Sequence, residues 1–216
     1  MLPSGNPRST FKTSLALAAL LVSLCAGSKA QTPAEVTISK IDPLLVPAPI
    51  IPYSGAAPKN VPVRKWAEIE TSFSWQPLNP SEKYTDDLTV TYYVLLNNKS
   101  IQYPQGALLS GQVALSSVPA KSLDPSNSQL RTVMYISPRS LERFFGGRAP
   151  ADLNSSLIDV GVTVSKQGRV IAQKSMRSTS GAWWPQYQQF PGFLLAKQDT
   201  PFAPLNWDYY ENGRKP

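Results

Sequence analysis

Residues 156–176 read SLIDVGVTVSKQGRVIAQKSM, and they carry the clearest pattern in the chain. Apolar residues at positions 158, 160, 162 and 164 alternate with small or polar ones, which is the pattern of a strand with one buried face. Gln167-Gly168 supplies a two-residue turn, and Val170 and Ala172 resume the apolar face on the returning side. The stretch therefore predicts a β-hairpin.

The same alternation recurs through the middle of the chain. It is found in RKWAEIETSFSW (64–75), LTVTYYVLL (88–96), SIQY (100–103), QVALSSV (112–118) and LRTVMYIS (130–137). One short helix is predicted in SPRSLERFFGG (137–147), with Ser137 as its N-cap, Pro138 in its first turn and Gly146 as its C-terminal cap. About seven short strands and one helix predict an all-β fold, a β-sandwich over residues 64–178.

The chain opens with the layout of a secretory signal peptide. Two basic residues come first, residues 13–26 are apolar, and Ser28 and Ala30 occupy the small-residue positions of a cleavage site. We therefore expect residues 1–30 to be a signal peptide, with a mature start at Gln31. An uncleaved anchor is the alternative, and no later apolar run has the length of a membrane span.

Cysteine and histidine are nearly absent from this sequence. Cys25 is the only cysteine and lies inside the expected signal peptide, while histidine does not occur. Acylation of Cys25 ranks below simple cleavage, because a bulky residue, Leu24, precedes it. The missing residue types exclude the usual zinc sites and both Ser-His-Asp and Cys-His catalysis. We therefore expect no catalytic residue, no metal and no cofactor.

The charge balance also bears on the function. Without the expected signal peptide, 18 basic residues face 14 acidic ones, and they are spread along the chain. This is no nucleic-acid footprint, which would need a clustered basic face. An exported chain without disulfides favours the envelope of a Gram-negative-type bacterium: the periplasm, the outer membrane or the cell surface.

The acidic residues show no catalytic spacing. Asp86-Asp87 lies in a predicted turn, where aspartate serves turn geometry. Glu68 and Glu70 alternate on one strand, which is typical of a solvated face. A hydrolase that uses a pair of these carboxylates remains an alternative without specific support.

Arginines mark the predicted helix. Arg139, Arg143 and Arg148 form the densest basic spot of the domain. A solvated helix face is the interpretation that such a run favours.

Two unusual segments flank the predicted sandwich. Residues 31–63 hold seven prolines, which block helix and sheet interior, yet IDPLLVPAPIIPY within them is apolar. We expect a Pro-rich extended arm that either lies on the domain surface or binds something else. Residues 179–216 form the second segment, and WWPQYQQFPGFLLAKQDTPFAPLNWDYY (183–210) holds nine of the 21 aromatic residues together with four prolines.

Three interpretations of this aromatic tail compete. The rings could cover an open face or edge of a sheet, where each would contribute about 2–3 kcal/mol. They could instead anchor a protein partner, because Trp and Tyr are frequent interface anchors. They could also stack on glycans, because amphipathic rings suit a surface that is half polar. The candidate partner- or glycan-binding residues are Trp183, Trp184, Tyr187, Trp207, Tyr209 and Tyr210.

The chain is similar to a small group of exported proteins of Verrucomicrobia. The similarity lies in the expected signal peptide, the strands WAEIETSFSW and LTVTYYVLLNN and the tail motif TPFAPLNWDYY. The chain resembles immunoglobulin-like envelope proteins encoded beside type IV pilus-like genes. The resemblance implies an immunoglobulin-like β-sandwich, an envelope location and a role in or near a pilus-like assembly. It brings no active-site residues. The chain lacks the start of a polymerising pilin, since Gly5 is followed by NPRST, with no long apolar helix directly after it.

These observations together predict a non-enzymatic envelope protein, a scaffold or interaction component of a pilus-like surface assembly. The expected partners are envelope or pilus-assembly proteins. A carbohydrate-binding module for mucin glycans is the alternative. The sequence leaves the oligomeric state open.

Overall fold

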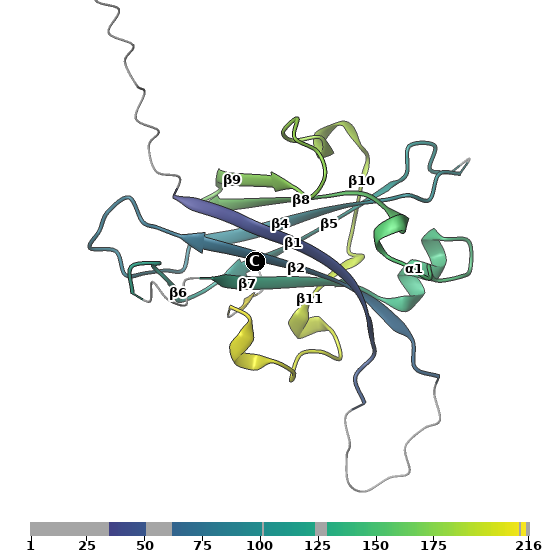
Figure 1. Cartoon of the computed structure of the whole chain (residues 1–216), viewed down its shortest axis with the longest axis horizontal. Coiled ribbons are helices and arrows are strands. Elements are labelled where there is room, and N and C mark those ends of the chain that lie inside the picture. The colour runs from purple at the N-terminus through teal and green to yellow at the C-terminus, as the bar shows by residue number, and fades with distance from the viewer. Residues whose placement is uncertain (1–34, 51–61, 101, 124–128, 212, 215–216) are drawn as a thin grey trace, which may run out of the picture. The chain divides into compact units, whose positions relative to one another are not determined.

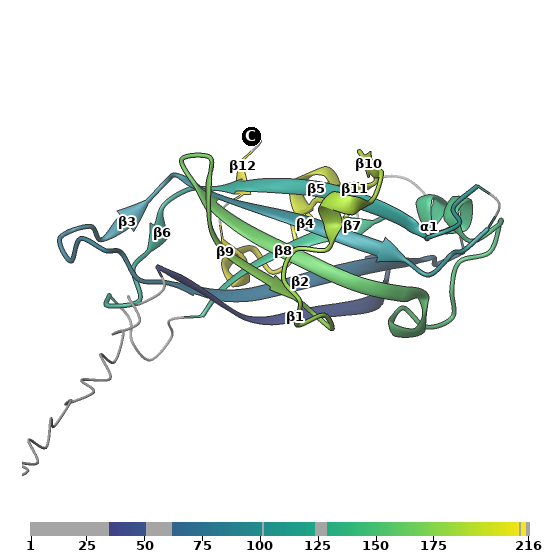
Figure 2. The same cartoon turned by 90° about the horizontal axis from the view of Figure 1, so that it is seen from above.

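The alternating segments fold into two sheets that pack face to face (Figures 1 and 2). The structure is a computed structural model that describes residues 35–50, 62–100, 102–123, 129–211 and 213–214. These residues belong to one compact unit, Pro33–Pro216. The expected signal peptide lies outside the described residues, and so do positions 31–34 and 51–61 of the expected arm.

The first sheet has four strands, in the order β1 (Val36–Pro47), β2 (Lys65–Trp75), β7 (Leu130–Ile136) and β11 (Leu194–Ala196). The second has six, with β10 (Gln189–Pro191), β5 (Ala107–Leu115), β4 (Leu88–Leu96), β8 (Leu157–Lys166) and β9 (Arg169–Ser175) in order, and β12 (Gly213–Arg214) also paired with β5. A small ribbon joins β3 (Tyr84–Thr85) to β6 (Val118–Pro119). All pairs are antiparallel except β10 with β5. The all-β sandwich that the sequence predicts is confirmed.

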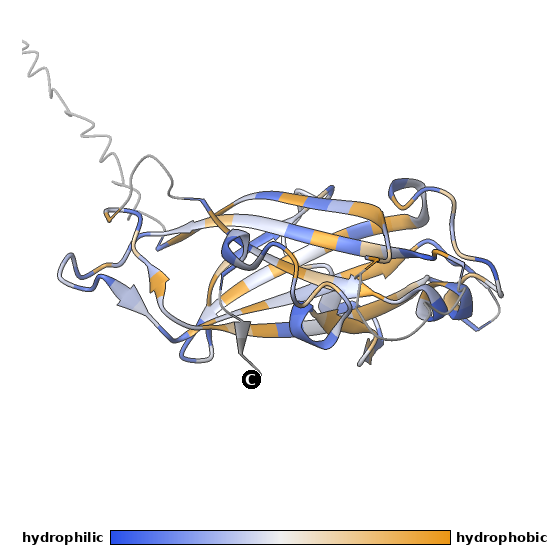
Figure 3. Ribbon diagram, turned by 90° about the horizontal axis from the view of Figure 1, so that it is seen from below, coloured by the Kyte–Doolittle hydropathy of each residue, from blue (hydrophilic) through white to orange (hydrophobic). Residues whose placement is uncertain are grey.

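The core lies between the inner faces of the two sheets. Alternate residues of β2, β4, β7 and β8 point inward and are buried. Figure 3 shows the strands banded with hydrophobic and hydrophilic residues. The largest side chains there include Phe73, Trp75, Tyr92 and Met134, each at most 1% exposed. Such alternation is what two sheets packed through one face require.

The predicted hairpin and helix are both confirmed. Strands β8 and β9 pair across Gln167 and Gly168, whose φ angles of 51° and 77° match the left-handed turn that favours strand twist. Helix α1 (Pro138–Phe144) begins after Ser137, whose side chain accepts a hydrogen bond from the backbone N–H of Ser140. The described residues also form four short 3₁₀ helices: η1 (Asn154–Ser156), η2 (Trp184–Gln186), η3 (Lys197–Asp199) and η4 (Trp207–Tyr209).

The described residues of the predicted strand 100–103, which are Ser100, Gln102 and Tyr103, do not form a strand. Ser100 and Tyr103 exchange two backbone hydrogen bonds, each 3.1 Å long. The next strand begins earlier than predicted, at Ala107, whose backbone N–H donates a hydrogen bond to the side-chain oxygen of buried Asn98. A side-chain contact of this kind leaves no periodic signal in the sequence.

The prediction that the Pro-rich segment stays outside the sandwich is wrong for residues 36–47. They form β1, the longest strand, which is paired along β2. β1 is an edge strand and pairs with β2 alone. Prolines 43 and 47 have no backbone N–H group to donate, and an edge strand tolerates this because its outer side has no partner strand. Val36, Ile38 and Ile41 point into the core.

The C-terminal segment is part of the sandwich and contributes β10, β11 and β12. It leaves β9, crosses the outer face of the six-stranded sheet at Trp184, and runs beside β5 as β10. It then pairs with β7 as β11 and covers the outer face of the four-stranded sheet with Phe202, before β12 returns to β5. We call residues 183–214 the strap. The predicted boundary at residue 178 is therefore not an edge of the domain.

Gly111 shows how closely the strap is fitted. A Cβ atom at this position of β5 would lie 2.6 Å from the Cβ of Leu194 and 2.7 Å from the methyl carbon of Met134. The glycine therefore lets β11 pass directly against β5 while it pairs with β7. The strap closes this side of the sandwich, where both sheets would otherwise have an open edge.

Candidate functional site

The six candidate aromatic residues separate into two groups on opposite sheets. Trp183, Trp184 and Tyr187 lie with Tyr93 on the outer face of the six-stranded sheet. Trp207, Tyr209 and Tyr210 lie beyond η3, on the side of the four-stranded sheet. A single continuous aromatic surface is therefore not formed.

The first group, which we call the Trp184 cluster, is a packing unit. Trp184 is 5% exposed, and its ring stacks on that of Tyr93 with centroids 4.8 Å apart and planes 7° apart. Trp183 packs edge-on against Trp184 and donates a hydrogen bond from its indole nitrogen to the Ser175 hydroxyl. The burial of the Trp184 ring argues against the binding role predicted for this residue.

The second group leaves its rings open to solvent. Trp207 is 68% exposed, Tyr209 46% and Leu205 37%. Asn206, with φ 50° and ψ 48°, adopts the left-handed conformation that turns the chain outward between Leu205 and Trp207. We call Leu205, Trp207 and Tyr209 the Trp207 surface.

Two cations hold the rings of this region in place. The Lys197 Nζ lies 5.5 Å from the Trp207 centroid and 5.8 Å from that of Tyr210, and it donates a 2.9 Å hydrogen bond to the Ala203 carbonyl. Burial lowers the pKa of Lys197. The Arg131 guanidinium sits 4.5 Å from the Tyr209 centroid. These are cation–π contacts, which orient a ring without covering its other face.

Carboxylates lie beneath these rings. Glu70 accepts hydrogen bonds from the hydroxyls of Tyr209 (3.4 Å) and Tyr210 (3.1 Å), and its carboxylate lies 3.9 Å from Arg131. Glu68 accepts a 2.9 Å hydrogen bond from the Tyr135 hydroxyl, and burial raises its pKa despite this bond. The prediction that Glu68 and Glu70 form a solvated face is therefore wrong, because the strap covers this face of β2.

A pocket of about 100 Å³ opens beside the Trp207 surface. Lys197, Gln198, Trp207 and Glu211 line it together with residues of β5 and β7. Burial raises the pKa of Glu211, an effect that outweighs the opposing influence of Arg131. The pocket thus combines an open indole ring with an amide, an amine and a carboxyl group.

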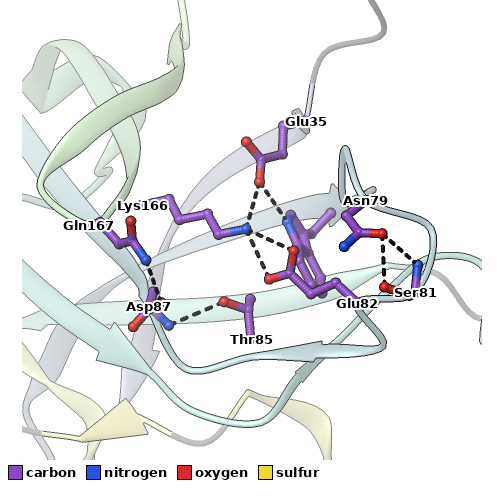
Figure 4. A network of polar contacts seen from close by, with 9 residues as sticks. Glu35, Asn79, Ser81, Glu82, Thr85, Asp87, Lys166 and Gln167 are labelled. Carbon is purple, nitrogen blue, oxygen red and sulfur yellow. Dashed lines mark hydrogen bonds and ion pairs between the residues drawn. The ribbon is translucent and has the colours of Figure 1, made fainter.

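A polar network that was not predicted from the sequence lies at the start of β1 (Figure 4). The Lys166 Nζ bonds Glu35 at 2.9 Å and both carboxylate oxygens of Glu82 at 3.0 and 3.2 Å. The Trp75 ring lies 5.2 Å from this amine, and its indole N–H reaches Glu35 at 3.4 Å. Burial opposes the charge on Lys166, but the bonds to both glutamates outweigh it and raise its pKa.

This network joins three segments that lie far apart in sequence, so no local motif could reveal it. Both carboxylates are bound to the same amine, which favours a structural role. Nearby, Asp86 accepts a 2.6 Å hydrogen bond from the Ser117 backbone, and Asp87 accepts one of 3.1 Å from Gln167. The pair lies at the bend between β3 and β4, as predicted, but its carboxylates bond residues of distant segments.

Two further findings concern the described residues. Among them, no group of three or more acidic, cysteine or histidine side chains is placed to hold a metal ion. Within the same residues, no helix is both long and apolar enough to cross a membrane.

The fold and its surface define an all-β sandwich closed by its own C-terminal strap, with an exposed aromatic surface on that strap. A protein-family model matches residues 27–216, and the chain belongs to this family.

Similarity to other known proteins extends this result. The chain is similar to a protein from Akkermansia muciniphila whose crystal structure is known, with a TM-score of 0.67 and 23% identity over 84% of this chain and 94% of the other. This similarity shows the fold. No curated protein matches the chain.

Proposed function

We propose that the chain is a non-enzymatic interaction component of the cell envelope, which holds a protein partner through the Trp207 surface. The observation that carries this proposal is the 68% exposure of Trp207 beside exposed Leu205 and Tyr209, in a strap that is anchored by the buried rings of Trp184 and Phe202. The domain does not need this ring for its core. Tryptophan and tyrosine at the centre of a patch are the residues that most often dominate binding free energy.

Several features support a role without catalysis. The chain has no histidine, and its one cysteine lies in the expected signal peptide. The carboxylates of Glu68, Glu70, Glu35 and Glu82 are all bonded to neighbouring side chains. A general acid or base would need to face a substrate.

The expected location and partner complete the proposal. The expected signal peptide supports export, and the resemblance to envelope proteins encoded beside pilus-like genes supports a place in a pilus-like surface assembly. In this role the immunoglobulin-like sandwich is the rigid scaffold, and the strap presents the contact.

Site-specific photo-crosslinking in the native envelope tests this proposal. A photoreactive amino acid at position 207 is expected to give one discrete adduct. Tyr84, which is 60% exposed on the β3–β6 ribbon, is the matched control position and should give none of that adduct. Absence of an adduct at 207, or the same adducts at both positions, would contradict the proposal.

A glycan is a second candidate ligand, favoured by the pocket beside Trp207. An open indole next to amide, amine and carboxyl groups can stack on a sugar ring and bond its hydroxyls. If this candidate is right, mucin oligosaccharides should quench tryptophan fluorescence, and Trp207→Ala should abolish the quenching while Trp183→Phe keeps it. Unchanged fluorescence across a concentration series would rule against the glycan.

A further inference from the structure

Charged residues are distributed unevenly between the two ends of the sandwich. Helix α1 lies at one end of the strands, and the β3–β6 ribbon lies at the other (Figure 2). At the ribbon end the charges balance, with Lys83, Lys121, Lys166 and Arg169 against Glu35, Glu82, Asp86 and Asp87. Among the described residues, the basic residues at the α1 end include Arg64, Lys65, Lys99, Arg139, Arg143 and Arg148, against Glu142 and Asp152. We call these six residues the basic end.

Contacts with α1 bring these residues together from separate segments. Arg64, just before β2, lies 3.4 Å from the Glu142 carboxylate. The Asn98 side chain donates a 3.0 Å hydrogen bond to the Phe144 carbonyl, which places the turn containing Lys99 against the end of the helix. Arg139 and Arg143 are one helical turn apart, so they project from one side of α1.

Arg139, Arg143 and Arg148 are exposed and, unlike Arg64, lack acidic partners in ion pairs. Among the described residues, no carboxylate forms an ion pair with Arg139, Arg143, Arg148 or Lys99. Arg143 lies instead 5.1 Å from the Phe193 centroid, a contact that orients the guanidinium and leaves its N–H groups available. A guanidinium held in this way suits phosphate, to which it can donate two parallel hydrogen bonds.

Exposed aliphatic side chains adjoin these cations. Ile50 is 82% exposed and Val63 58%. Both lie at the open end of the β1–β2 hairpin, where Ala48 bonds the Arg64 carbonyl. Cations beside exposed aliphatic groups are the combination that a lipid surface binds, because headgroup phosphates meet the cations and the acyl boundary meets the aliphatic groups.

We propose that the basic end docks on an anionic lipid membrane, with the phosphates of the headgroups as its ligands. The charge excess explains why this end and not the ribbon end makes the contact, and the two aliphatic side chains favour lipid over a purely polar polyanion. This proposal does not depend on the Trp207 surface. Docking by the basic end would leave that surface free for a partner.

Vesicle sedimentation with residues 33–216 tests the proposal. These residues contain both sheets and the whole core, and they omit the expected signal peptide, which would itself bind lipid. Vesicles of equal parts phosphatidylglycerol and phosphatidylcholine should bind the protein, and vesicles of phosphatidylcholine alone should not. Binding should vanish at about 1 M salt, where the screening length falls to about 3 Å.

Two charge-matched variants locate the contact. Each basic residue near an anionic surface raises the partition coefficient onto vesicles about fivefold. We therefore expect a partition coefficient about a hundredfold lower for the triple variant Arg139→Gln/Arg143→Gln/Arg148→Gln. Lys83→Gln/Lys121→Gln/Arg169→Gln removes the same charge at the ribbon end and should bind within about twofold of the parent. The double variant Arg139→Gln/Arg148→Gln keeps the Arg143 ring contact and should lose about 25-fold.

Other outcomes would overturn the proposal. Equal losses in the two triple variants would mean that net charge alone drives binding. Displacement by inorganic phosphate beyond that caused by chloride at equal ionic strength would indicate a discrete phosphate site. Binding to heparin without binding to vesicles would identify an acidic polysaccharide in place of a membrane.

Discussion

Gly161→Ala is the substitution that best tests how the strap joins the sandwich. Gly161 lies on the outer face of β8, directly beneath the Trp184 ring. A Cβ atom there would lie 2.4 Å from Cε3 and 2.5 Å from Cζ3 of Trp184. The backbone at this glycine does not require positive φ. An alanine would therefore be tolerated, or even stabilising by about 0.4–1 kcal/mol, if the tryptophan were absent.

The structure sets the expected magnitude. Ordinary contact begins near 3.4 Å, so the indole must lift by about 1 Å from its present position. Lifting it loses the stack on Tyr93, about 0.5–1.5 kcal/mol, and opens the packing against Leu95 and Leu108. Complete loss of a buried tryptophan costs about 3–5 kcal/mol, which bounds the effect. We expect Gly161→Ala to lower the free energy of unfolding by about 2–4 kcal/mol.

Urea unfolding followed by circular dichroism provides the measurement, in a cycle with Trp184→Ala. In the Trp184→Ala background, Gly161→Ala should be neutral or slightly stabilising, because the clash has been removed. A coupling free energy near zero, or a Gly161→Ala protein as stable as the parent, would refute the placement of Trp184 on this face. The structural interpretation of the first half of the strap would then fail.

Three further predictions concern the other face and the polar network. Phe202 is 7% exposed and stacks on Tyr135 with ring centroids 4.5 Å apart. Phe202→Ala should therefore lower the free energy of unfolding in urea by about 3–4 kcal/mol. Trp207→Ala is the control, and it should change this free energy by less than about 0.5 kcal/mol because the Trp207 ring is exposed. The pKa of Glu211 is raised in the folded state above its ordinary value of 4.5. The folded state therefore keeps a proton that the unfolded state loses, and the contribution of Glu211 to the free energy of unfolding declines as pH rises through the folded pKa. Glu211→Gln should therefore match the parent at about pH 4 and exceed its stability at about pH 8, and a constant difference across this range would contradict the assignment. Lys166→Met should cost about 1–3 kcal/mol at neutral pH, because it leaves Glu35 and Glu82 without their cation. Since the folded pKa of Lys166 is raised above 10.5, its contribution is complete below pH 10.5 and is lost as pH rises through the folded pKa, so the stability difference from the parent should shrink there.

The candidate site could be predicted in part. An unusual density of rings drew attention to residues 183–210, and this segment does carry the exposed Trp207 surface. The sequence could not separate Trp184 from Trp207, because both are tryptophans beside other aromatic residues in a segment broken by prolines. Their exposures of 5% and 68% depend on which sheet face each one meets.

The outer face of β2 shows the same limit. Glu68 and Glu70 alternate with apolar residues, and a strand whose second face is wet would have the same pattern. Phe202, Tyr209 and Tyr210, more than a hundred positions later, cover this face. The sequence contains no local sign of this cover.

What the sequence alone determined are the elements whose causes are local. Side chains alternate across a strand with period two, so the hairpin of β8 and β9 was visible in its own residues. The capping hydroxyl of Ser137 lies beside the helix that it begins. The tertiary structure decided the rest: that β1 joins the sheet despite its prolines, that the aromatic tail becomes a strap, and that Lys166 unites two distant glutamates. β1 fills an open sheet edge, the strap covers an exposed sheet face, and Lys166 pairs with two carboxylates. The edge, the face and the carboxylates are formed by other segments, and they come together only when the two sheets pack.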